Sequence, residues 1–193
     1  NLFVAILNST VAKYFLNALN PTLNYQNIDI ARIPVPDLKK FHVVIEEINS
    51  IVEEIISIHE NDWNQKETSW GFFKNPLVNS NNLLECSYAE WRRTSLKAFF
   101  RVCKNEERLN MVFADIYSLE ECVSTKITLR QITLLQEELS QNDLRTLEYQ
   151  YKEDGTDAIE LPIKKDVVMQ QLISYAVGCM MGRYRLDIPG LHI

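Results

Sequence analysis

Residues 37–63 read DLKKFHVVIEEINSIVEEIISIHENDW, and this stretch decides how the chain folds. Six apolar residues and a final histidine recur in alternating steps of three and four residues: Leu38, Phe41, Ile45, Ile48, Val52, Ile55 and His59. That spacing predicts an amphipathic helix that begins at residue 38 and ends near residues 62–66. Asp37 is expected to cap it, because a carboxylate accepts hydrogen bonds from the free amides of a first turn. A seam this regular predicts a partner helix, either within this chain or from another one.

Helical spacing predicts further helices on both sides of this stretch. We expect an opening apolar helix over 2–16 that Pro21 ends, a second long helix over 83–121, and a last helix over 165–184. Three isoleucines between 28 and 33 alternate loosely before two prolines, which predicts a short edge strand there. An aromatic loop over 67–82 lacks periodicity and is expected to pack across the helices.

Residues 123–163 allow two interpretations. Alternation around Leu147 and Tyr149, a turn signal at Asp154-Gly155 and renewed alternation over 159–163 favour a small β-hairpin. A helix over 131–145 is the competing interpretation. The predicted fold class is therefore mainly α, a helical bundle with long helices and a small β element.

Composition limits the classes of function that the chain can have. The net charge of -6 and the isoelectric point near 5.2 argue against a self-sufficient nucleic-acid-binding domain, so any contact with DNA must be local. The four cysteines and three histidines lack the spacing of metal ligands, so we expect no metal and interpret the cysteines as reduced core residues. The apolar run over 172–181 is far shorter than the roughly 20 residues that cross a bilayer. We therefore expect a cytoplasmic protein without a membrane span.

A row of cations is the strongest candidate for a binding surface. Steps of four, four, three and four residues place five basic side chains on one side of the second long helix: Arg93, Lys97, Arg101, Lys104 and Arg108. Such a row can follow DNA phosphates, because each contact adds to a salt-dependent affinity. The alternative is a solvated helix face whose cations pair with Glu90, Glu106 and Glu107 on the same helix, each pair contributing about 0.2–0.5 kcal/mol.

An amide-rich segment provides a second candidate contact with DNA. Asn24, Gln26 and Asn27 could read base edges, since Asn and Gln can pair bidentately with adenine. More often such a cluster caps turns, and both interpretations remain open from the sequence alone.

The last predicted helix carries small residues at a spacing of four, namely Ser174, Gly178 and Gly182. Because glycine costs a helix interior about 1 kcal/mol, this stripe predicts that something approaches the backbone closely. Another helix is one explanation. Nucleic acid is the other, supported by Arg183 and Arg185 just beyond the stripe.

No catalytic constellation is visible in the sequence. There is no glycine-rich phosphate loop and no serine or cysteine nucleophile with a clear histidine partner. The carboxylate pairs at 46–47, 53–54 and 106–107 are expected on solvated faces of long helices. We therefore predict no catalytic residues in this chain.

Three groups of residues together resemble one protein family. They read ILNS at 6–9 with NPTLNY at 20–25 and IARIPVP at 30–36, then ETSWGF at 67–72 before NPL at 75–77, and finally LISYAVGCMMGRY at 172–184 through LD at 186–187 to PGL at 189–191. They resemble the C-terminal part of the large adenine-specific DNA methyltransferases of the BREX and phage-growth-limitation defence systems. These enzymes are relatives of the single-chain type II restriction-modification enzymes.

The resemblance implies a parent protein that transfers a methyl group from S-adenosylmethionine to the exocyclic amine of a flipped adenine. The family grips that base with an Asn-Pro-Pro-Tyr type motif, but Asn20-Pro21-Thr22 and Asn75-Pro76-Leu77 each lack the second proline and the aromatic residue. We therefore expect the catalytic domain upstream. This chain, which does not begin with methionine, is expected to be a non-catalytic piece that binds no cofactor itself.

By the same resemblance, residues 1–36 correspond to the C-terminal tail of a target-recognition domain, and residues 37–193 to a helical domain that braces it over DNA. The expected partners are DNA, the upstream methyltransferase and recognition domains, and other subunits of a defence system. The alternative is a protein-docking module, in which the helix over 38–59 binds partner subunits and no residue touches DNA.

Overall fold

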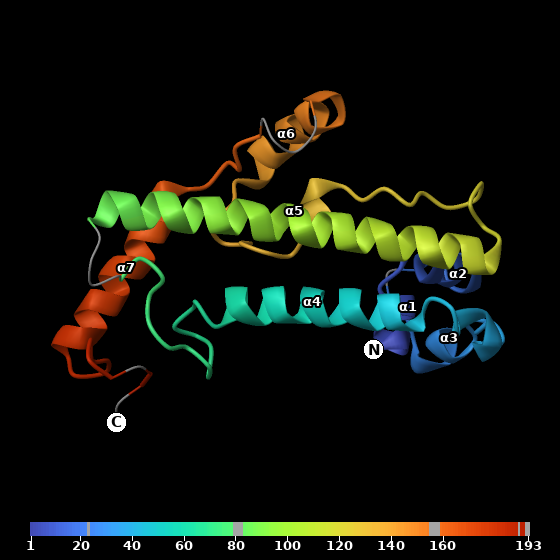
Figure 1. Ribbon diagram of the computed structural model, residues 1–193, viewed down its shortest axis with the longest axis horizontal. Coiled ribbons are helices and arrows are strands. Elements are labelled where there is room, and N and C mark those ends of the chain that lie inside the picture. The colour runs from blue at the N-terminus through green and yellow to red at the C-terminus, as the bar shows by residue number, and fades with distance from the viewer. Residues whose placement is uncertain (23, 79–82, 155–158, 189, 192–193) are drawn as a thin grey trace. The chain divides into compact units, whose positions relative to one another are not determined.

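The computed structural model describes residues 1–22, 24–78, 83–154, 159–188 and 190–191, and in them the chain is mainly α as predicted (Figure 1). The α-helices are α1 Leu2–Leu7, α2 Thr10–Leu19, α3 Asn27–Ala31, α4 Ile45–Trp63, α5 Leu84–Tyr117, α6 Gln141–Asp154 and α7 Lys165–Met180. Two 3-10 turns, η1 Leu38–Phe41 and η2 Leu129–Gln131, complete the regular elements. Among the described residues there is no strand, and β pairing is limited to isolated bridges such as Leu139 with Ile163.

The chain divides into two compact units, which we describe separately. Unit 1 comprises Asn1–Ile56 and Val102–Ile127, and unit 2 comprises Ser57–Arg101 and Thr128–Ile193. These limits differ from the division at residue 36, whose assignment to a recognition domain and a helical domain stays a prediction. Within the described parts of both units, no helix combines the length and the apolar content that crossing a membrane requires.

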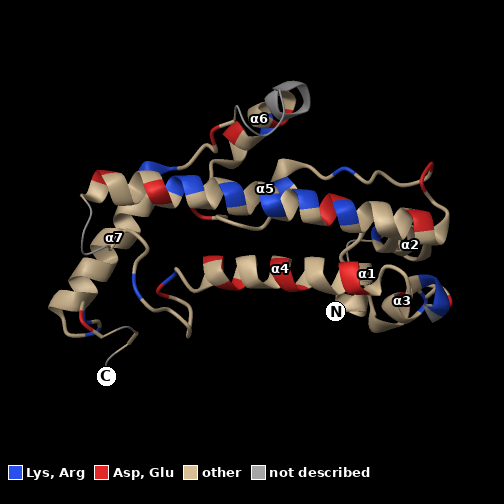
Figure 2. Cartoon of the chain, viewed as in Figure 1, with Lys and Arg blue, Asp and Glu red and all other residues tan. Residues whose placement is uncertain are grey.

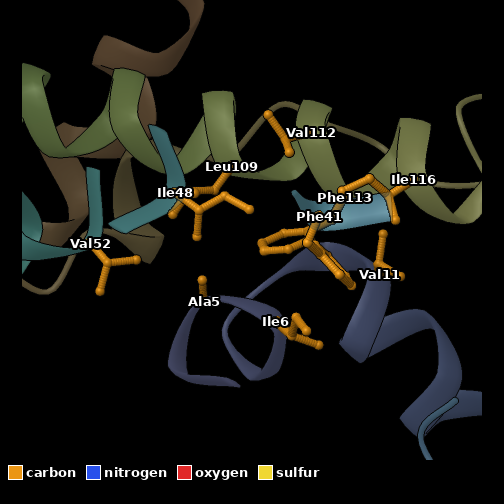
Figure 3. Close-up of a cluster of buried hydrophobic side chains, with 10 residues drawn as sticks. All are labelled: Ala5, Ile6, Val11, Phe41, Ile48, Val52, Leu109, Val112, Phe113 and Ile116. Carbon is orange, nitrogen blue, oxygen red and sulfur yellow. The ribbon is translucent and has the colours of Figure 1, made fainter. Parts of the chain in front are cut away.

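The core of unit 1 forms where the seam of α4 meets α5. Figure 3 shows side chains from α1, α2, η1, α4 and α5 pointing into one shared space. The buried members are Ala5, Ile6, Val11, Phe41, Ile48, Val52, Leu109, Val112, Phe113 and Ile116. Burying each large apolar side chain stabilises the fold by about 1.5–3 kcal/mol. The seam thus has its predicted partner helix within this chain.

The predicted start of that helix is wrong, although its end is confirmed. Asp37 Oδ1 accepts a hydrogen bond from Lys39 N at 3.0 Å, but the turn that it caps is the short η1. The chain bends after η1, which buries Phe41 and leaves Val43 93% exposed, and α4 starts only at Ile45. It ends at Trp63, within the predicted range.

The opening apolar run forms two helices instead of one. Ser9 separates them, and its Oγ caps α2 by accepting a hydrogen bond from Ala12 N at 3.2 Å. The edge strand expected over 28–33 is also wrong, because α3 lies there. Asp29 accepts hydrogen bonds from Gln26 N at 2.9 Å and from Asn20 Nδ2 at 2.8 Å, and this capping box favours a helical turn over an extended segment.

In unit 2, the segment expected to be a hairpin or an earlier helix folds differently. Helix α6 covers the first expected hairpin arm and lies about ten residues later than the competing helix over 131–145. The Asp154-Gly155 turn signal extends beyond the described residues, which resume at Ile159. The second arm contributes only the bridge from Ile163 to Leu139.

The aromatic loop packs on the last helix of unit 2, as predicted. Phe72 lies 5.8 Å from Tyr175 of α7 and 5.3 Å from Tyr184, measured between ring centroids. Its neighbours Trp70 and Phe73 point away and are 105% and 63% exposed. Helix α7 ends at Met180, so the predicted extension to residue 184 is wrong.

The prediction that the cysteines are core residues holds only in part. Cys103 is buried and Cys179 is partly buried, but Cys86 and Cys122 are exposed. None of the four forms a disulfide bond.

Candidate nucleic-acid interface

The C-terminal half of helix α5, which belongs to unit 1, is more deeply buried than its N-terminal half, which belongs to unit 2. Between residues 102 and 116 all but four side chains are buried or partly buried, because this part of the helix packs in the core of unit 1. The predicted cations occupy exposed positions along the helix: Arg93, Lys97, Arg101, Lys104 and Arg108. Figure 2 shows several blue segments, which mark lysine and arginine, along α5. We call these five residues the cation line; Arg93, Lys97 and Arg101 belong to unit 2, and Lys104 and Arg108 belong to unit 1.

Arg108 has a defined carboxylate partner on another helix. Its Nε lies 2.6 Å from Glu47 Oε1 and its Nη2 lies 3.1 Å from Glu47 Oε2, which is a bidentate pair within unit 1. The hydrogen bond from Arg108 lowers the pKa of Glu47, and the same contact raises the pKa of Arg108. Arg101 also takes part in an interaction within the chain.

Arg93, Lys97 and Lys104 make no ion pair with any residue that the structure describes. The intrahelical pairs expected with Glu90, Glu106 and Glu107 are not formed there either. Three cations are therefore exposed and available to an anionic partner.

The acidic residues of α5 that were expected to be solvated are instead part of the packing of unit 1. Glu107 is 7% exposed, and its carboxylate accepts hydrogen bonds from Lys126 Nζ at 2.8 Å and Ile127 N at 3.4 Å. Glu106 is partly buried, and the loss of hydration raises its pKa to about 7. The solvated-face prediction is wrong for this pair.

The amide-rich segment lies in unit 1, and Asn24, Gln26 and Asn27 are all exposed. Gln26 forms the cap of α3, and the backbone carbonyl of Asn24 accepts hydrogen bonds from Asn20 Nδ2 at 3.2 Å and Thr22 Oγ1 at 3.3 Å. No described hydrogen bond or ion pair connects these three residues with the cation line. Their ability to read bases stays a prediction.

The two arginines after α7 lie in unit 2 and are exposed. Arg185 is held by Asp187, with its Nε 2.9 Å from Oδ1 and its Nη2 2.6 Å from Oδ2. This pairing raises the pKa of Arg185 and offsets its charge locally. Arg183 follows directly after Gly182, which lies outside the helix with a φ of 77°. The small-residue stripe on α7 therefore ends at Gly178.

Both Asn-Pro pairs form tight turns. Asn20 donates to Asp29 and accepts from Thr22 N at 3.1 Å and Thr22 Oγ1 at 2.6 Å. Asn75 is 3% exposed, and its Oδ1 accepts from Leu77 N at 3.0 Å. Both amide side chains therefore hydrogen-bond within their own turns.

A buried polar cluster in unit 2 was missed by the sequence analysis. Lys66 Nζ lies 3.6 Å from Glu138 Oε2, and Gln171 Nε2 donates to Glu138 Oε1 at 2.7 Å. Asp62 lies beside them, and burial raises its pKa. These residues line a cavity of about 10 Å³, which has room for about one water molecule and none for S-adenosylmethionine or a base. The cluster arises from residues far apart in the chain, so no local pattern could have revealed it.

Comparisons with known proteins confirm the resemblance seen in the sequence. The chain is 30% identical over 188 residues to the adenine-specific methyltransferase BrxX of Escherichia coli O9:H4 (strain HS). It is also 30% identical over 196 residues to the adenine-specific methyltransferase PglX of Lacticaseibacillus casei (strain Zhang). Both alignments cover 97% of this chain, but the chain spans only 14% of the length of each relative. No family model matches the chain.

Proposed function

We propose that this chain is a non-catalytic part of an adenine-specific DNA methyltransferase in a bacterial defence system, and that it holds target DNA by its phosphates. The names of the two relatives support the methyltransferase activity of the whole protein. We expect the methyl donor and the flipped adenine to bind in the upstream part of that protein, because this chain lacks the base-gripping motif. The role of this chain is to position DNA and the recognition domain.

The cation line of α5 carries the proposal for DNA contact. In a chain with a net charge of -6, five basic residues succeed one another at the exposed positions of one helix. Phosphate contacts position a protein on DNA without reading its sequence. The available cations Arg93, Lys97 and Lys104 would supply most of the contacts.

The other predicted DNA contacts are secondary in this proposal. Asn24, Gln26 and Asn27 are exposed and retain side-chain groups that could meet base edges. Arg183 and Arg185 could add phosphate contacts, but Arg185 must first leave its bidentate pair with Asp187. We therefore expect smaller effects from these five residues than from the cation line.

The alternative function is a docking module in which the seam of α4 binds a partner subunit, but three residues of that seam are buried. Phe41, Ile48 and Val52 are buried in the core of unit 1 against α1, α2 and α5. A partner subunit could reach these side chains only by displacing parts of this chain. The DNA-positioning role is therefore the better supported of the two.

A matched pair of triple variants tests the proposal. Arg93→Glu, Lys97→Glu and Lys104→Glu change the net charge from -6 to -12, because each substitution contributes -2. The control changes Lys13, Lys39 and Lys40 to Glu, which alters the net charge equally at exposed positions of α2 and η1. Circular dichroism verifies that both variants fold.

Binding to a DNA duplex of about 20 base pairs is then measured by fluorescence anisotropy at low salt. The α5 variant should bind at least about tenfold more weakly than the control, because it loses phosphate contacts as well as net charge. Equal affinities of the two variants would show that α5 does not contact DNA.

A further inference from the structure

The buried polar cluster of unit 2 contains one acceptor atom without a donor. Glu138 is 3% exposed, and its Oε1 accepts a hydrogen bond from Gln171 Nε2 at 2.7 Å. Its Oε2 is buried and accepts no hydrogen bond from any residue that the structure describes. Lys66 Nζ lies 3.6 Å from this oxygen, which is longer than an N–H···O hydrogen bond. A buried carboxylate oxygen without a donor is costly, so a further donor is expected beside it.

Three N–H donors around this oxygen are already used. Gln171 donates to the other oxygen of the same carboxylate. The indole Nε1 of Trp91 donates to Gln65 Oε1 at 3.0 Å, and the backbone N of Leu135 donates to Asp62 Oδ2 at 3.5 Å. Satisfying the free oxygen therefore calls for a donor that these groups do not supply.

The cavity of about 10 Å³ in unit 2 has the size and the lining for one water molecule. Asp62, Lys66 and Glu138 all line it, and every residue around it belongs to unit 2. A volume of about 10–15 Å³ is enough for one water, which needs two to four polar partners. The ammonium group of Lys66 can donate to a water there, and the carboxylates of Glu138 and Asp62 can accept from it.

A metal ion fits this cavity less well than water. Lys66 already places a positive charge 3.6 Å from Glu138 Oε2, and a second cation there would be repelled by it. Within the described part of the chain, no group of three His, Cys, Asp or Glu side chains could hold a metal ion. Water is neutral and can donate two hydrogen bonds, so it serves both carboxylates without adding charge.

We propose that this cavity binds one water molecule, which accepts a hydrogen bond from Lys66 and donates to Glu138 and Asp62. Asp62 lies in α4, Glu138 lies between η2 and α6, and Gln171 of α7 holds the other carboxylate oxygen. The water thus completes a polar junction between three segments of unit 2. Because Lys66 is its donor, the water supplements the ion pair and does not replace it. This proposal does not depend on DNA binding by α5.

A high-resolution crystal structure of the 193-residue chain tests the proposal directly. We expect one peak of electron density in the cavity at about 2.5–3.0 Å from Glu138 Oε2, the range of O–H···O hydrogen bonds. Crystals soaked in rubidium chloride distinguish water from a monovalent cation, because rubidium replaces such a cation and scatters anomalously. We expect no anomalous peak. An empty cavity, or an anomalous peak within it, would overturn the proposal.

Filling the cavity tests the same claim in solution. Val168 of α7 lines the cavity and is 2% exposed, and Val168→Ile adds one methylene group there. In a dry cavity the added group would improve the packing and raise the stability. In a hydrated cavity it displaces the water and leaves Glu138 Oε2 without a donor. The midpoint of urea unfolding should then fall by roughly 0.5–1 M.

The double variant Lys66→Met with Glu138→Leu provides the matched background, because it lacks the ion pair that holds the water. In this background Val168→Ile should raise the midpoint or leave it unchanged, since no buried ion pair loses a partner. A higher or unchanged midpoint for Val168→Ile in the unmodified chain would mean that the cavity holds no water. Equal falls of the midpoint in both backgrounds would indicate overpacking alone. Either result would overturn the proposal.

Discussion

The ring of Tyr184 occupies the space that a side chain at Gly178 would need. A Cβ added at Gly178 would lie 2.6 Å from Tyr184 Cδ2 and 2.7 Å from Cε2. The ring cannot retreat easily, because it stacks on Tyr175 at 5.2 Å and packs against Phe72 at 5.3 Å between centroids. The close approach predicted from the glycine is therefore real, and an aromatic side chain of the same chain makes it.

Gly178→Ala should destabilise the protein by about 1–3 kcal/mol, because overpacking outweighs the roughly 1 kcal/mol gain in helix propensity. Urea unfolding followed by circular dichroism measures the change. The double variant Gly178→Ala with Tyr184→Leu should recover part of the gain in propensity. An unchanged unfolding midpoint for Gly178→Ala alone would show that the aromatic rings can move aside without a cost in stability.

Glu106 should make the stability of the protein depend on pH. Burial raises its pKa from 4.5 to about 7, so the folded state prefers the protonated form. Its stabilising contribution is present below about pH 4.5 and is lost as the pH rises through about 7. At about 1.4 kcal/mol per pKa unit, and discounted because the group is only partly buried, the loss should be about 1–2 kcal/mol.

Glu106→Gln should remove this loss and leave the variant more stable than the unmodified chain above pH 7. The exposed Glu60 gives a matched control, since Glu60→Gln changes the charge equally without a buried carboxylate. Urea unfolding at a series of pH values provides the comparison. Parallel stability curves for the unmodified chain and Glu106→Gln would disprove the assignment.

Replacing only Lys66 or only Glu138 should destabilise the protein more than replacing both by apolar residues. Their side chains are only 13% and 4% exposed. Lys66→Met leaves the carboxylate buried without its cation and should cost about 3 kcal/mol. Adding Glu138→Leu should restore at least half of that stability. A single substitution that costs less than about 0.5 kcal/mol would mean that water or Gln171 already satisfies the carboxylate.

Releasing Arg108 from Glu47 should strengthen DNA binding. Glu47→Gln removes the charge of the bidentate partner and leaves Arg108 free to meet a phosphate. We expect about two- to fivefold tighter binding and a cost in stability of no more than about 1 kcal/mol, because the pair is exposed. Glu46→Gln changes the neighbouring exposed carboxylate and controls for net charge. Equal affinities of these two variants would exclude Arg108 from the DNA contact.

Long periodic segments were predictable from the sequence, because their pattern is set by the core that they bury. The seam of α4 and the extent of α5 follow from apolar residues at three- and four-residue steps. Short segments were not predictable from the sequence. Loose alternation at 28–33 suggested a strand, but three residues carry too little pattern, and the capping box of Gln26 and Asp29 decided for a helix.

For the candidate site, the sequence predicted only which positions along the helix carry cations. The sequence places five cations on one side of α5, but the pairing of Arg108 with Glu47 depends on how α4 packs against α5 in unit 1. The burial of Glu107 likewise depends on Lys126, which lies beyond the helix. Contacts between distant segments decide which charges remain available, and a single sequence does not contain them.

The salt dependence of DNA binding tests the central claim most directly. The slope of log K against log salt concentration is measured for the unmodified chain, for the triple variant of Arg93, Lys97 and Lys104, and for the control triple variant of Lys13, Lys39 and Lys40. Each lost phosphate contact reduces the slope by about 0.9, so the α5 variant should be shallower by about 2.7 while the control keeps the original slope. Three equal slopes would contradict the account, because α5 would then carry none of the contacts with DNA.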